Sequence, residues 1–378
     1  MNLAFCLFRF FPYGGLQRDF LRIARTCLQR GHRVRVFAMS WEGEVPAELE
    51  LHLVPAHGMS NHARCSSFVR GVLPLLAQGG FDATVGFNKM PGLDIYYAAD
   101  TCFQARSREK HGPLFRLGSR YRTFVELEGS VFSPSAGTEI LLISPMEKPK
   151  FQSCYGTQEE RFHLLPPGIS PDRIAPENAS AIRAEVRREL GVPTEDKLVL
   201  MVGSAFKTKG LDRALRALAA LPEALRRRSC LVVVGRGENA PFLRLARRLG
   251  VEDRLHLLGG RDDVPRFLLA ADLLLHPAYT ENTGTVLLEA LAAGLPVLAT
   301  EVCGYGFHVR EAQAGLLVSE PFRQEQLNHQ LLQMLSPVAA GTWRENALAY
   351  VRRTDIFSLP EKAADLIEET ARRRVPRA

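Results

Sequence analysis

Short apolar runs separated by amphipathic stretches organise the first half of the chain. Residues 3–8 predict a buried strand, residues 16–30 carry apolar side chains at helical spacing, and residues 34–38 predict a second strand. A strand, a helix and a strand in this order form a parallel unit with a right-handed crossover. Further strands, with helices between them, are expected at 51–54, 82–86, 94–98 and 139–143.

The second half restarts the same alternation after a proline-rich segment. Pro166-Pro167-Gly168 predicts a hinge, because proline ends a strand and glycine frees the backbone. We therefore predict an α/β chain of two Rossmann-like, doubly wound domains, residues 1–167 and 168–353. The strands expected in the second domain are 197–202, 231–234, 255–258, a run within 271–277, 297–300 and 316–318. The helices expected there are 211–220, 240–249, one ending near 271, 283–293, 324–335 and 342–351.

The composition agrees with two globular α/β domains and argues against several classes of protein. The chain has 378 residues, of which 46% are hydrophobic and 24% charged, a balance typical of globular proteins. Its seven cysteines form no Cys-x-x-Cys pair, which argues against a disulfide framework or a structural zinc site and favours a reducing cytoplasm. No apolar run approaches a membrane span, and residues 1–11 are better explained as a strand than as a signal peptide. The net charge of +7 permits anionic partners without identifying one.

The stretch from Glu281 to Glu289 carries the strongest chemical signal. It follows an apolar strand and begins the helix expected at 283–293, which Gly294 and Pro296 end. Amides in the first turn of a helix have no partner within it and favour a phosphate. Carboxylates accept hydrogen bonds from vicinal hydroxyls. Two glutamates beside a phosphate site predict a nucleotide-sugar site; the alternative is a solvated helix with two surface carboxylates.

Five positions in the first half are weaker candidates. Gly15 lies between a strand and a helix, where a backbone can approach a phosphate or simply make a tight turn. Asp19 is expected in the first turn of that helix, near the same point or only stabilising the helix dipole. Asp100 follows an apolar strand at the ligand-binding edge of the sheet, or caps the next helix. Asn88 and Lys89 lie in a polar loop at the same edge, on the acceptor side.

A family resemblance rests on the pattern around the two glutamates. Glu281-x7-Glu289, with His276-Pro277 before it and Gly294-Leu-Pro296-Val297 after it, resembles the retaining glycosyltransferases of family 4. This resemblance implies the GT-B fold, with two Rossmann-like domains facing across a cleft. It also implies that the last helix, 360–374, crosses back, so that about 354–378 complete the first domain. The first domain would take the acceptor and the second the nucleotide sugar.

The same family has a Gly-Arg…Lys-Gly element whose lysine neutralises the donor diphosphate. Lys209-Gly210 matches the end of that element. The arginine is missing, because Ser204 follows Gly203, so a second cation such as Lys207 would have to replace it. An ordinary surface lysine is the alternative for Lys209.

A narrower resemblance covers more of the chain. Phe11-Pro-x-Gly-Gly-Leu-Gln-Arg-Asp-Phe20, Gly86-Phe-Asn-Lys-Met-Pro-Gly-Leu-Asp94 and Leu165-Pro-Pro-Gly-Ile169 are similar to the lipopolysaccharide core glucosyltransferase I enzymes. That branch implies a cytoplasmic enzyme, associated with the inner membrane, that adds glucose to the inner-core heptose of heptosylated lipid A. Residues 103–132 interleave arginines with aromatic residues, which suits an anionic membrane surface. The alternatives are a solvated helix with core aromatics and, less favoured, a nucleic-acid surface; we expect no nucleic-acid partner.

The resemblance assigns roles to the candidates. Glucose would move from UDP-glucose to a heptose hydroxyl with retention, through departure and attack on the same face. No metal or cofactor is expected, because Lys209 and the helix amides would stabilise the diphosphate and no Asp-x-Asp motif is present. The catalytic candidates are Glu281, Lys209, Asp100 and Asp19. The candidates for donor binding are Gly15, Lys209, Arg261 near the uracil, Glu281, Asn282, Thr283, Gly284, Thr285, Val286, and Glu289 at the ribose.

Other functions stay open at this point. Gly235-x-Gly-x-x-Ala240 matches a dinucleotide fingerprint and would suit an NAD(P)-dependent oxidoreductase. The acid expected after the next strand is absent, since that strand leads into Gly259-Gly260-Arg261. A transferase with another hexose donor or glycolipid acceptor, or a non-catalytic sugar- or membrane-binding module, would also fit. The donor hexose, the acceptor hydroxyl and the oligomeric state are not determined by the sequence.

Overall fold

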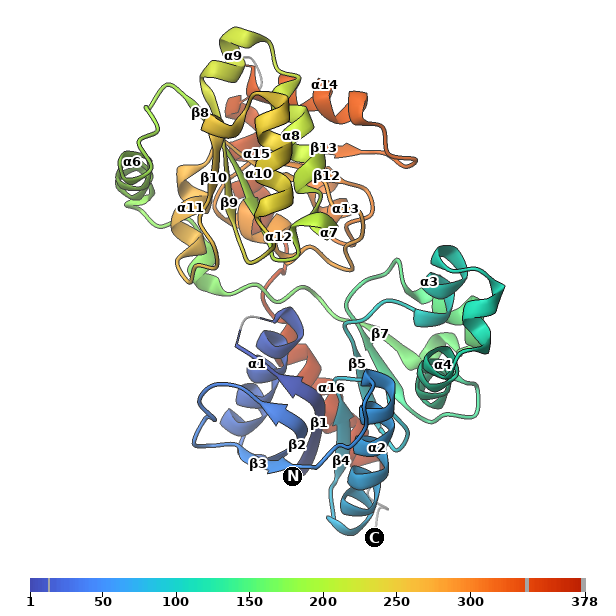
Figure 1. The fold of residues 1–378 in the computed structure, drawn as a ribbon. Helices are drawn as coiled ribbons and strands as arrows, with labels where there is room; N and C mark the ends of the chain where they lie inside the picture. Colours follow the sequence, from blue (N-terminus) through green and yellow to red (C-terminus); the bar gives the residue numbers. More distant parts are fainter. Residues whose placement is uncertain (13, 337–339, 375–378) are drawn as a thin grey trace. The chain divides into compact units, whose positions relative to one another are not determined.

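The computed structural model describes residues 1–12, 14–336 and 340–374, and the chain forms two compact units (Figure 1). Unit 1 comprises Met1–Gly168 and the chain from Phe357 onward, and unit 2 comprises Ile169–Ile356. The sequence analysis placed these divisions before 168 and before 354. In the described residues, no helix is both long enough and apolar enough to cross a bilayer.

Unit 1 is built on a parallel sheet of seven strands in the order β3-β2-β1-β4-β5-β6-β7. The strands are β1 (Asn2–Phe10), β2 (Arg33–Trp41), β3 (Glu50–Leu53), β4 (Ala83–Gly86), β5 (Ile95–Ala98), β6 (Glu139–Leu142) and β7 (Phe162–Leu164). The helices are α1 (Gly15–Gln29), α2 (Asn61–Gln78), α3 (Phe103–Lys110), η1 (Pro113–Leu117), α4 (Ser119–Phe132), α5 (Lys148–Tyr155), η2 (Glu159–Arg161) and α16 (Leu359–Arg374).

Both faces of this sheet are buried, as the apolar strand runs predict. Successive side chains of a strand point to opposite faces, so Phe5 of β1 packs in one core and Cys6 in the other. The first core also contains Phe20 of α1 and Ile367 of α16, and the second contains Phe68 of α2. Helix α16 lies beside α1 (Figure 1), which confirms that the last helix returns to the first domain.

Unit 2 repeats this architecture with six parallel strands in the order β10-β9-β8-β11-β12-β13. The strands are β8 (Lys197–Val202), β9 (Ser229–Val234), β10 (Leu255–Leu257), β11 (Leu273–His276), β12 (Val297–Thr300) and β13 (Gly315–Val318). The helices are η3 (Pro171–Arg173), α6 (Ala179–Glu189), α7 (Phe206–Lys209), α8 (Leu211–Ala219), α9 (Glu223–Arg227), α10 (Ala240–Leu249), η4 (Glu252–Arg254), α11 (Val264–Ala270), α12 (Thr285–Ala292), α13 (Gly306–Ala312), α14 (Gln324–Leu335) and α15 (Ala340–Arg353). Two Rossmann-like units confirm the predicted fold class.

Two local predictions were wrong. The first helix after the strand at 197–202 was expected to begin at 211, but Phe206 is buried in the core and anchors a short additional helix, α7, before it. Asp19 was expected in the first turn of its helix. Because α1 begins at Gly15 with Gly14 as its N-cap, no acid lies in the first turn and Asp19 comes after it.

Candidate active site

The carboxylate of Glu281 lies between two basic side chains at the carboxyl edge of the unit 2 sheet. Lys209, at the end of α7, donates a hydrogen bond to Glu281 Oε2 and forms an ion pair with it. His276, the last residue of β11, has its Nε2 3.1 Å from the same oxygen. These residues come together because β8, which precedes α7, and β11 are neighbouring parallel strands. The structure therefore joins Lys209 and Glu281, which the sequence analysis identified separately.

This cluster is mostly shielded from solvent. The Glu281 side chain is 14% exposed, that of Lys209 is 21% exposed, and that of His276 is 1% exposed. Nδ1 of His276 has no hydrogen-bond partner among the described residues, which favours the tautomer that donates from Nε2 to Glu281. Residue 281 also forms an isolated parallel β-bridge with Cys303, which fixes the backbone beneath the carboxylate.

The pKa of Glu281 is shifted by this environment. Burial raises the pKa, but the hydrogen bond from His276 and the positive charge of Lys209 outweigh burial and lower it to about 2. The carboxyl group is therefore ionised at neutral pH. An ionised carboxylate is acceptor-only, so it can receive hydrogen bonds from sugar hydroxyls.

Helix α12 begins immediately after this carboxylate. Gly284 is its N-cap at φ +82°, a left-handed conformation that favours glycine, and no side chain caps the helix. The predicted start at 283 was wrong, because the backbone turns at Gly284. The Thr283 carbonyl instead accepts a hydrogen bond from the Tyr305 amide, at 2.7 Å. Thr285 and Val286 are the first two helical residues, so their amides are the ones at the positive end of α12.

Glu289 lies farther along α12 and is 6% exposed. Arg173, in η3, places its Nε 3.8 Å from Glu289 Oε1. Nε and Nη1 of Arg173 are buried without a hydrogen-bond partner among the described residues. The sequence analysis missed Arg173, which lies shortly after the hinge predicted at Pro166-Pro167-Gly168. A single arginine in a proline-rich polar stretch gave no signal that it would contact Glu289.

The other predicted cations of unit 2 have acidic partners of their own. Arg261 contacts Asp263 through two hydrogen bonds, of 2.8 and 2.7 Å. The hydrogen bond from Arg261 lowers the pKa of Asp263 to about 2, against the opposing effect of burial. Lys207 is exposed and pairs with Asp212 at 3.0 Å. No contact places Arg261 or Lys207 in the Lys209–Glu281 cluster within the described part of the chain.

The glycines of the apparent dinucleotide fingerprint have a packing explanation. A Cβ on Gly235 would lie 2.2 Å from the carbonyl oxygen of Gly203, and one on Gly237 would lie 2.6 Å from the Phe206 ring. Both glycines are therefore required where loops of unit 2 meet. This removes the main argument for an oxidoreductase.

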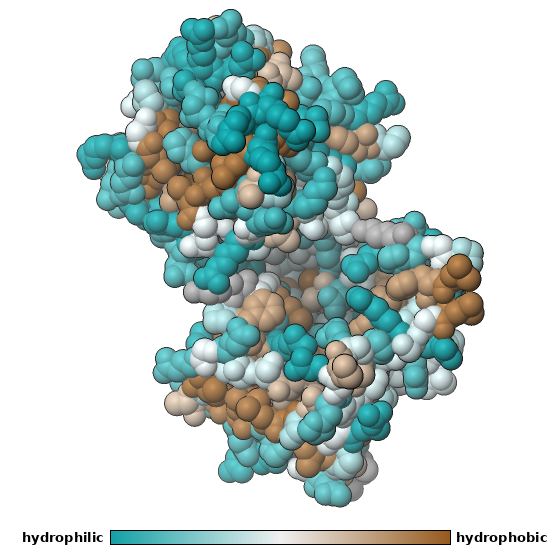
Figure 2. All heavy atoms as spheres, viewed as in Figure 1, coloured by the Kyte–Doolittle hydropathy of each residue, from teal (hydrophilic) through white to brown (hydrophobic). Residues whose placement is uncertain are grey.

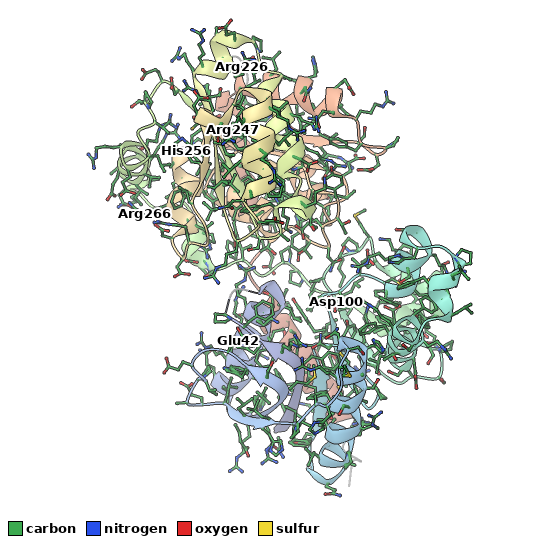
Figure 3. All side chains as sticks on the ribbon, in the orientation of Figure 1. Glu42, Asp100, Arg226, Arg247, His256 and Arg266 are labelled. Atoms are coloured by element: carbon green, nitrogen blue, oxygen red, sulfur yellow. The ribbon has the colours of Figure 1, made fainter. Side chains whose placement is uncertain are left out.

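The unit 1 candidates are spread along the carboxyl edge of its sheet. A Cβ on Gly15 would meet nothing within 4 Å, which leaves open space beside the start of α1. Asp19 accepts a hydrogen bond from the Tyr97 hydroxyl at 2.8 Å. Asp100, labelled in Figure 3, follows β5, is exposed and lines a cavity of about 400 Å³. It does not cap α3, whose N-cap is Cys102.

Residues 103–132 divide into a buried and an exposed part. Phe132 is fully buried in a core of unit 1, as the core alternative predicted for these aromatics. Leu114 and Leu117, which the sequence analysis did not single out, are 82% and 69% exposed. Apolar side chains gather at this outer edge of unit 1 next to α3 (Figure 2). The arginines of the segment are exposed around them.

Comparisons with known proteins agree with this architecture. The family of glycosyl transferases group 1 matches residues 182–349, and Glycosyltransferase Family 4 matches residues 13–173. The lipopolysaccharide glucosyltransferase WaaG of Escherichia coli strain K12 is 47% identical over 97% of this chain and 98% of its own. A D-inositol 3-phosphate glycosyltransferase of Salinispora tropica is 27% identical over 81% of this chain and 70% of its own.

Solved structures show the same relationship. The crystal structure of WaaG, a glycosyltransferase involved in lipopolysaccharide biosynthesis, matches with a TM-score of 0.92 at 47% identity, over 97% of this chain and 99% of that one. Anabaena Alr3699/HepE in complex with UDP-glucose matches with a TM-score of 0.73 at 19% identity, over 98% of this chain and 100% of that one, a likeness of fold alone. The chain therefore belongs to the family 4 glycosyltransferases of the GT-B fold, in the family of the lipopolysaccharide glucosyltransferase WaaG.

Proposed function

We propose that the chain transfers glucose from UDP-glucose to an inner-core heptose of heptosylated lipid A, with retention at the anomeric carbon. The observation that carries this proposal is the ionised, shielded Glu281 carboxylate beside Lys209 and the N-terminus of α12. The membership of the WaaG family supports the choice of a glucosyl donor and a lipopolysaccharide acceptor.

The donor would lie against unit 2. Lys209 and the amides of Thr285 and Val286 would bind the diphosphate, a role for which fixed positive groups at a helix N-terminus are suited. Glu281 would bind the glucose hydroxyls, with the backbone from Asn282 to Gly284 around it. Because Lys209 already contacts Glu281, one lysine would connect the sugar end and the phosphate end of the donor.

Glu289 and Arg261 would bind the nucleoside. Glu289 is buried and Arg173 approaches it, an arrangement that would hold its carboxylate in place for the ribose diol. Arg261 would border the uracil, after exchanging part of its contact with Asp263 for the base. In unit 1, the backbone at Gly15 would contact the diphosphate, and Asp19 and Asp100 would contact the donor glucose.

The proposed reaction breaks the bond between the anomeric carbon and the diphosphate and forms one to the acceptor oxygen on the same face. The acceptor proton passes to the departing diphosphate, whose growing charge Lys209 and the helix amides stabilise. These protein groups supply the positive charge, so we propose that no divalent metal is required.

Unit 1 would bind the acceptor, and residues 103–132 would hold the enzyme at the cytoplasmic face of the inner membrane. Leu114 and Leu117 are exposed beside several arginines, and this combination suits an anionic lipid surface.

The direct test is release of UDP from UDP-glucose in the presence of heptosylated lipid A. Lys209→Ala and Glu281→Ala should each lower kcat by about 10²–10³, the usual loss on removing a fixed stabilising group. Lys207→Ala is the matched control, because Lys207 is 71% exposed and paired with Asp212. Full activity in both Lys209→Ala and Glu281→Ala would refute the proposal, and a panel of UDP-hexoses would show whether another donor is preferred.

A further inference from the structure

The Glu281 carboxylate and its lysine partner lie on two segments of unit 2 whose backbones touch. Thr208 directly precedes that lysine, and its carbonyl accepts a hydrogen bond from the Tyr279 amide at 2.8 Å. A Cβ on Gly210, which directly follows the lysine, would lie 2.0 Å from the carbonyl oxygen of Pro277. The spacing between the carboxylate and the lysine therefore depends on how closely these two segments approach each other.

Arg213, in the first turns of α8, ties the two segments together. Its Nη1 donates hydrogen bonds to the carbonyl oxygens of Pro277 and Ala278, at 3.2 and 3.0 Å. Both carbonyls lie shortly before Glu281 in the chain. The carbonyl of Arg213 accepts a hydrogen bond from the Gln324 side chain at 3.0 Å, which connects this part of α8 to α14. One side chain thus links the helix after α7 to the loop after β11.

The guanidinium group of Arg213 is also held on both of its faces. Its Cζ lies 3.6 Å from the ring centroid of Tyr279 and 3.6 Å from that of Phe322. A planar guanidinium stacks favourably on aromatic rings. The Tyr279 hydroxyl donates a hydrogen bond to Asp212 at 2.8 Å, so this ring is fixed at its far end as well. The loop that leads to the carboxylate is therefore held through backbone and side chain together.

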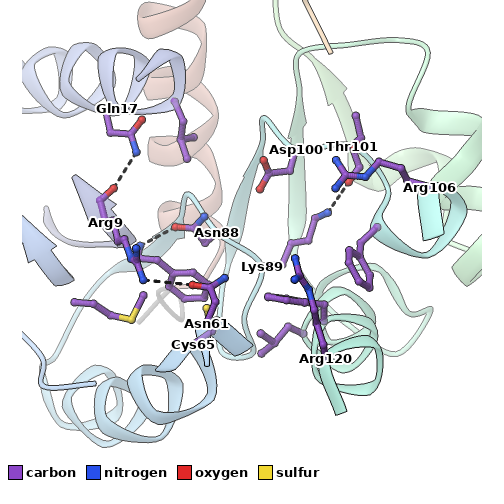
Figure 4. A pocket seen from close by; sticks show the side chains of 16 residues that line it. Arg9, Gln17, Asn61, Cys65, Asn88, Lys89, Asp100, Thr101, Arg106 and Arg120 are labelled. Atoms are coloured by element: carbon purple, nitrogen blue, oxygen red, sulfur yellow. Dashed lines mark hydrogen bonds between the residues drawn. The ribbon is translucent and has the colours of Figure 1, made fainter. Parts of the chain in front are cut away.

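Arg213 differs in this respect from the arginines of the unit 1 cavity. Arg9, Arg106 and Arg120 line that cavity and are exposed (Figure 4). Arg213 is half-buried, with aromatic rings over its faces and main-chain carbonyls at its Nη1. Its guanidinium is thus occupied by the protein itself, which suits a positioning role and not the binding of a ligand.

We propose that Arg213 is a positioning residue for glycosyl transfer, which holds residues 277–281 against α7 and so keeps Lys209 and Glu281 at a fixed spacing. The proposal rests on the proposed function for the roles of these two side chains. The hydrogen bonds of Arg213 reach main-chain carbonyls and neither of the two side chains, so its effect passes through the backbone. Charged groups stabilise a transition state best when their positions are fixed in advance.

Calorimetric titration of UDP and uridine into the full chain tests this role without catalysis. Arg213→Met keeps a side chain of similar reach but removes the guanidinium. It should lower the preference for UDP over uridine about fivefold or more and leave uridine affinity unchanged. Arg216→Met is the matched control, because Arg216 lies on the same helix, is exposed and has no side-chain partner among the described residues. An equal loss of UDP and uridine affinity in Arg213→Met would show a general structural role and overturn the proposal.

Arg213→Lys separates the guanidinium from its charge. Lysine keeps the charge and can still donate to a carbonyl, but its ammonium group lacks the flat faces that stack between two rings. Its preference for UDP should therefore lie between those of Arg213→Met and the wild type. A wild-type preference in Arg213→Met, or in Arg213→Lys should the methionine variant not fold, would contradict the positioning role.

Transfer assays separate this proposal from the proposed function. With UDP-glucose and heptosylated lipid A, Arg213→Met should lower kcat about tenfold and leave the KM of the acceptor unchanged. Transfer at the wild-type kcat in a folded Arg213→Met variant would overturn the positioning role and leave the glucosyltransferase intact. A preference for UDP that depends on Arg213, in a chain that transfers no glucose, would refute the function and retain the positioning of the diphosphate site.

Discussion

The two charged regions, one in each unit, differ in how their charges are matched. In unit 2, Glu281 already contacts Lys209 and His276. In the unit 1 cavity, Arg106 and Arg120 have no ion-pair partner in the described residues. A carboxylate held by fixed partners needs little rearrangement when a substrate arrives. Glu281 is thus held by its partners before any substrate binds, whereas the exposed Arg106 and Arg120 are held by no ion pair in the described residues.

The largest expected effect comes from Lys89, which forms an ion pair with the buried Glu128 carboxylate of unit 1. Glu128 is fully buried and also accepts hydrogen bonds from the Phe103 amide and the Tyr155 hydroxyl. Lys89→Met would leave this buried carboxylate without its cation and should lower the free energy of unfolding by about 3–5 kcal/mol. Chemical denaturation measures this loss.

The control for Lys89 is Lys148→Met. Lys148 also pairs with a glutamate, but the side chains of Lys148 and Glu159 are 31% and 64% exposed, so the loss should be below about 1 kcal/mol. Lys89→Met/Glu128→Gln should recover part of the stability. A Lys89→Met variant as stable as the wild type would mean that the Lys89 charge is free for ligands.

The next effect is the pH dependence that Glu281 gives to stability. Its pKa is about 2 in the folded chain against an ordinary value of 4.5. A lowered pKa in the folded state stabilises the protein above the ordinary pKa, and this contribution disappears as the pH falls from 4.5 towards 2. Its size is about 3 kcal/mol. Glu281→Gln should therefore have a flatter profile of unfolding free energy than the wild type between pH 2 and 5, and parallel profiles would contradict the interaction of Glu281 with Lys209 and His276.

The smallest effect concerns the exposed Leu114 and Leu117 of η1. Leu114→Asp/Leu117→Asp should lower affinity for anionic vesicles about tenfold, because insertion of these apolar side chains is lost. Leu53→Asp is the matched control, since Leu53 is 54% exposed on β3, outside residues 103–132. Cosedimentation with anionic vesicles measures the binding of both variants. Equal binding by the wild type, Leu114→Asp/Leu117→Asp and Leu53→Asp would contradict the proposed membrane role of residues 103–132.

Much of the fold could be predicted from apolar patterning alone. A strand buried on both faces is an uninterrupted apolar run, and residues 3–8 and 197–202 are such runs. Parallel strands place their carboxyl ends at one edge, so a motif after each strand locates part of a site. Glu281 was found in this way, whereas Lys209, 72 residues away in the sequence, was identified through the family resemblance.

The predictions that failed depended on tertiary contacts or on the direction of side chains. Arg173 contacts Glu289 from a 3-10 turn far away in sequence, and nothing in its neighbours indicates this. Asp19 was placed in the wrong turn because the helix starts at Gly15, before its first apolar residue. The sequence also shows the arginines of residues 103–132 as one basic stretch. Only the packing of α3 and α4 decides that Arg106 and Arg120 line the cavity.

The central claim is that Lys209 and the start of α12 hold a sugar diphosphate. Calorimetric titration of UDP and uridine into the wild-type chain, Lys209→Ala and the control Lys207→Ala tests it most directly. We predict that the wild type and Lys207→Ala bind UDP at least about tenfold more tightly than uridine, and that Lys209→Ala loses most of this preference. An unchanged preference in Lys209→Ala would place the diphosphate elsewhere and contradict the account.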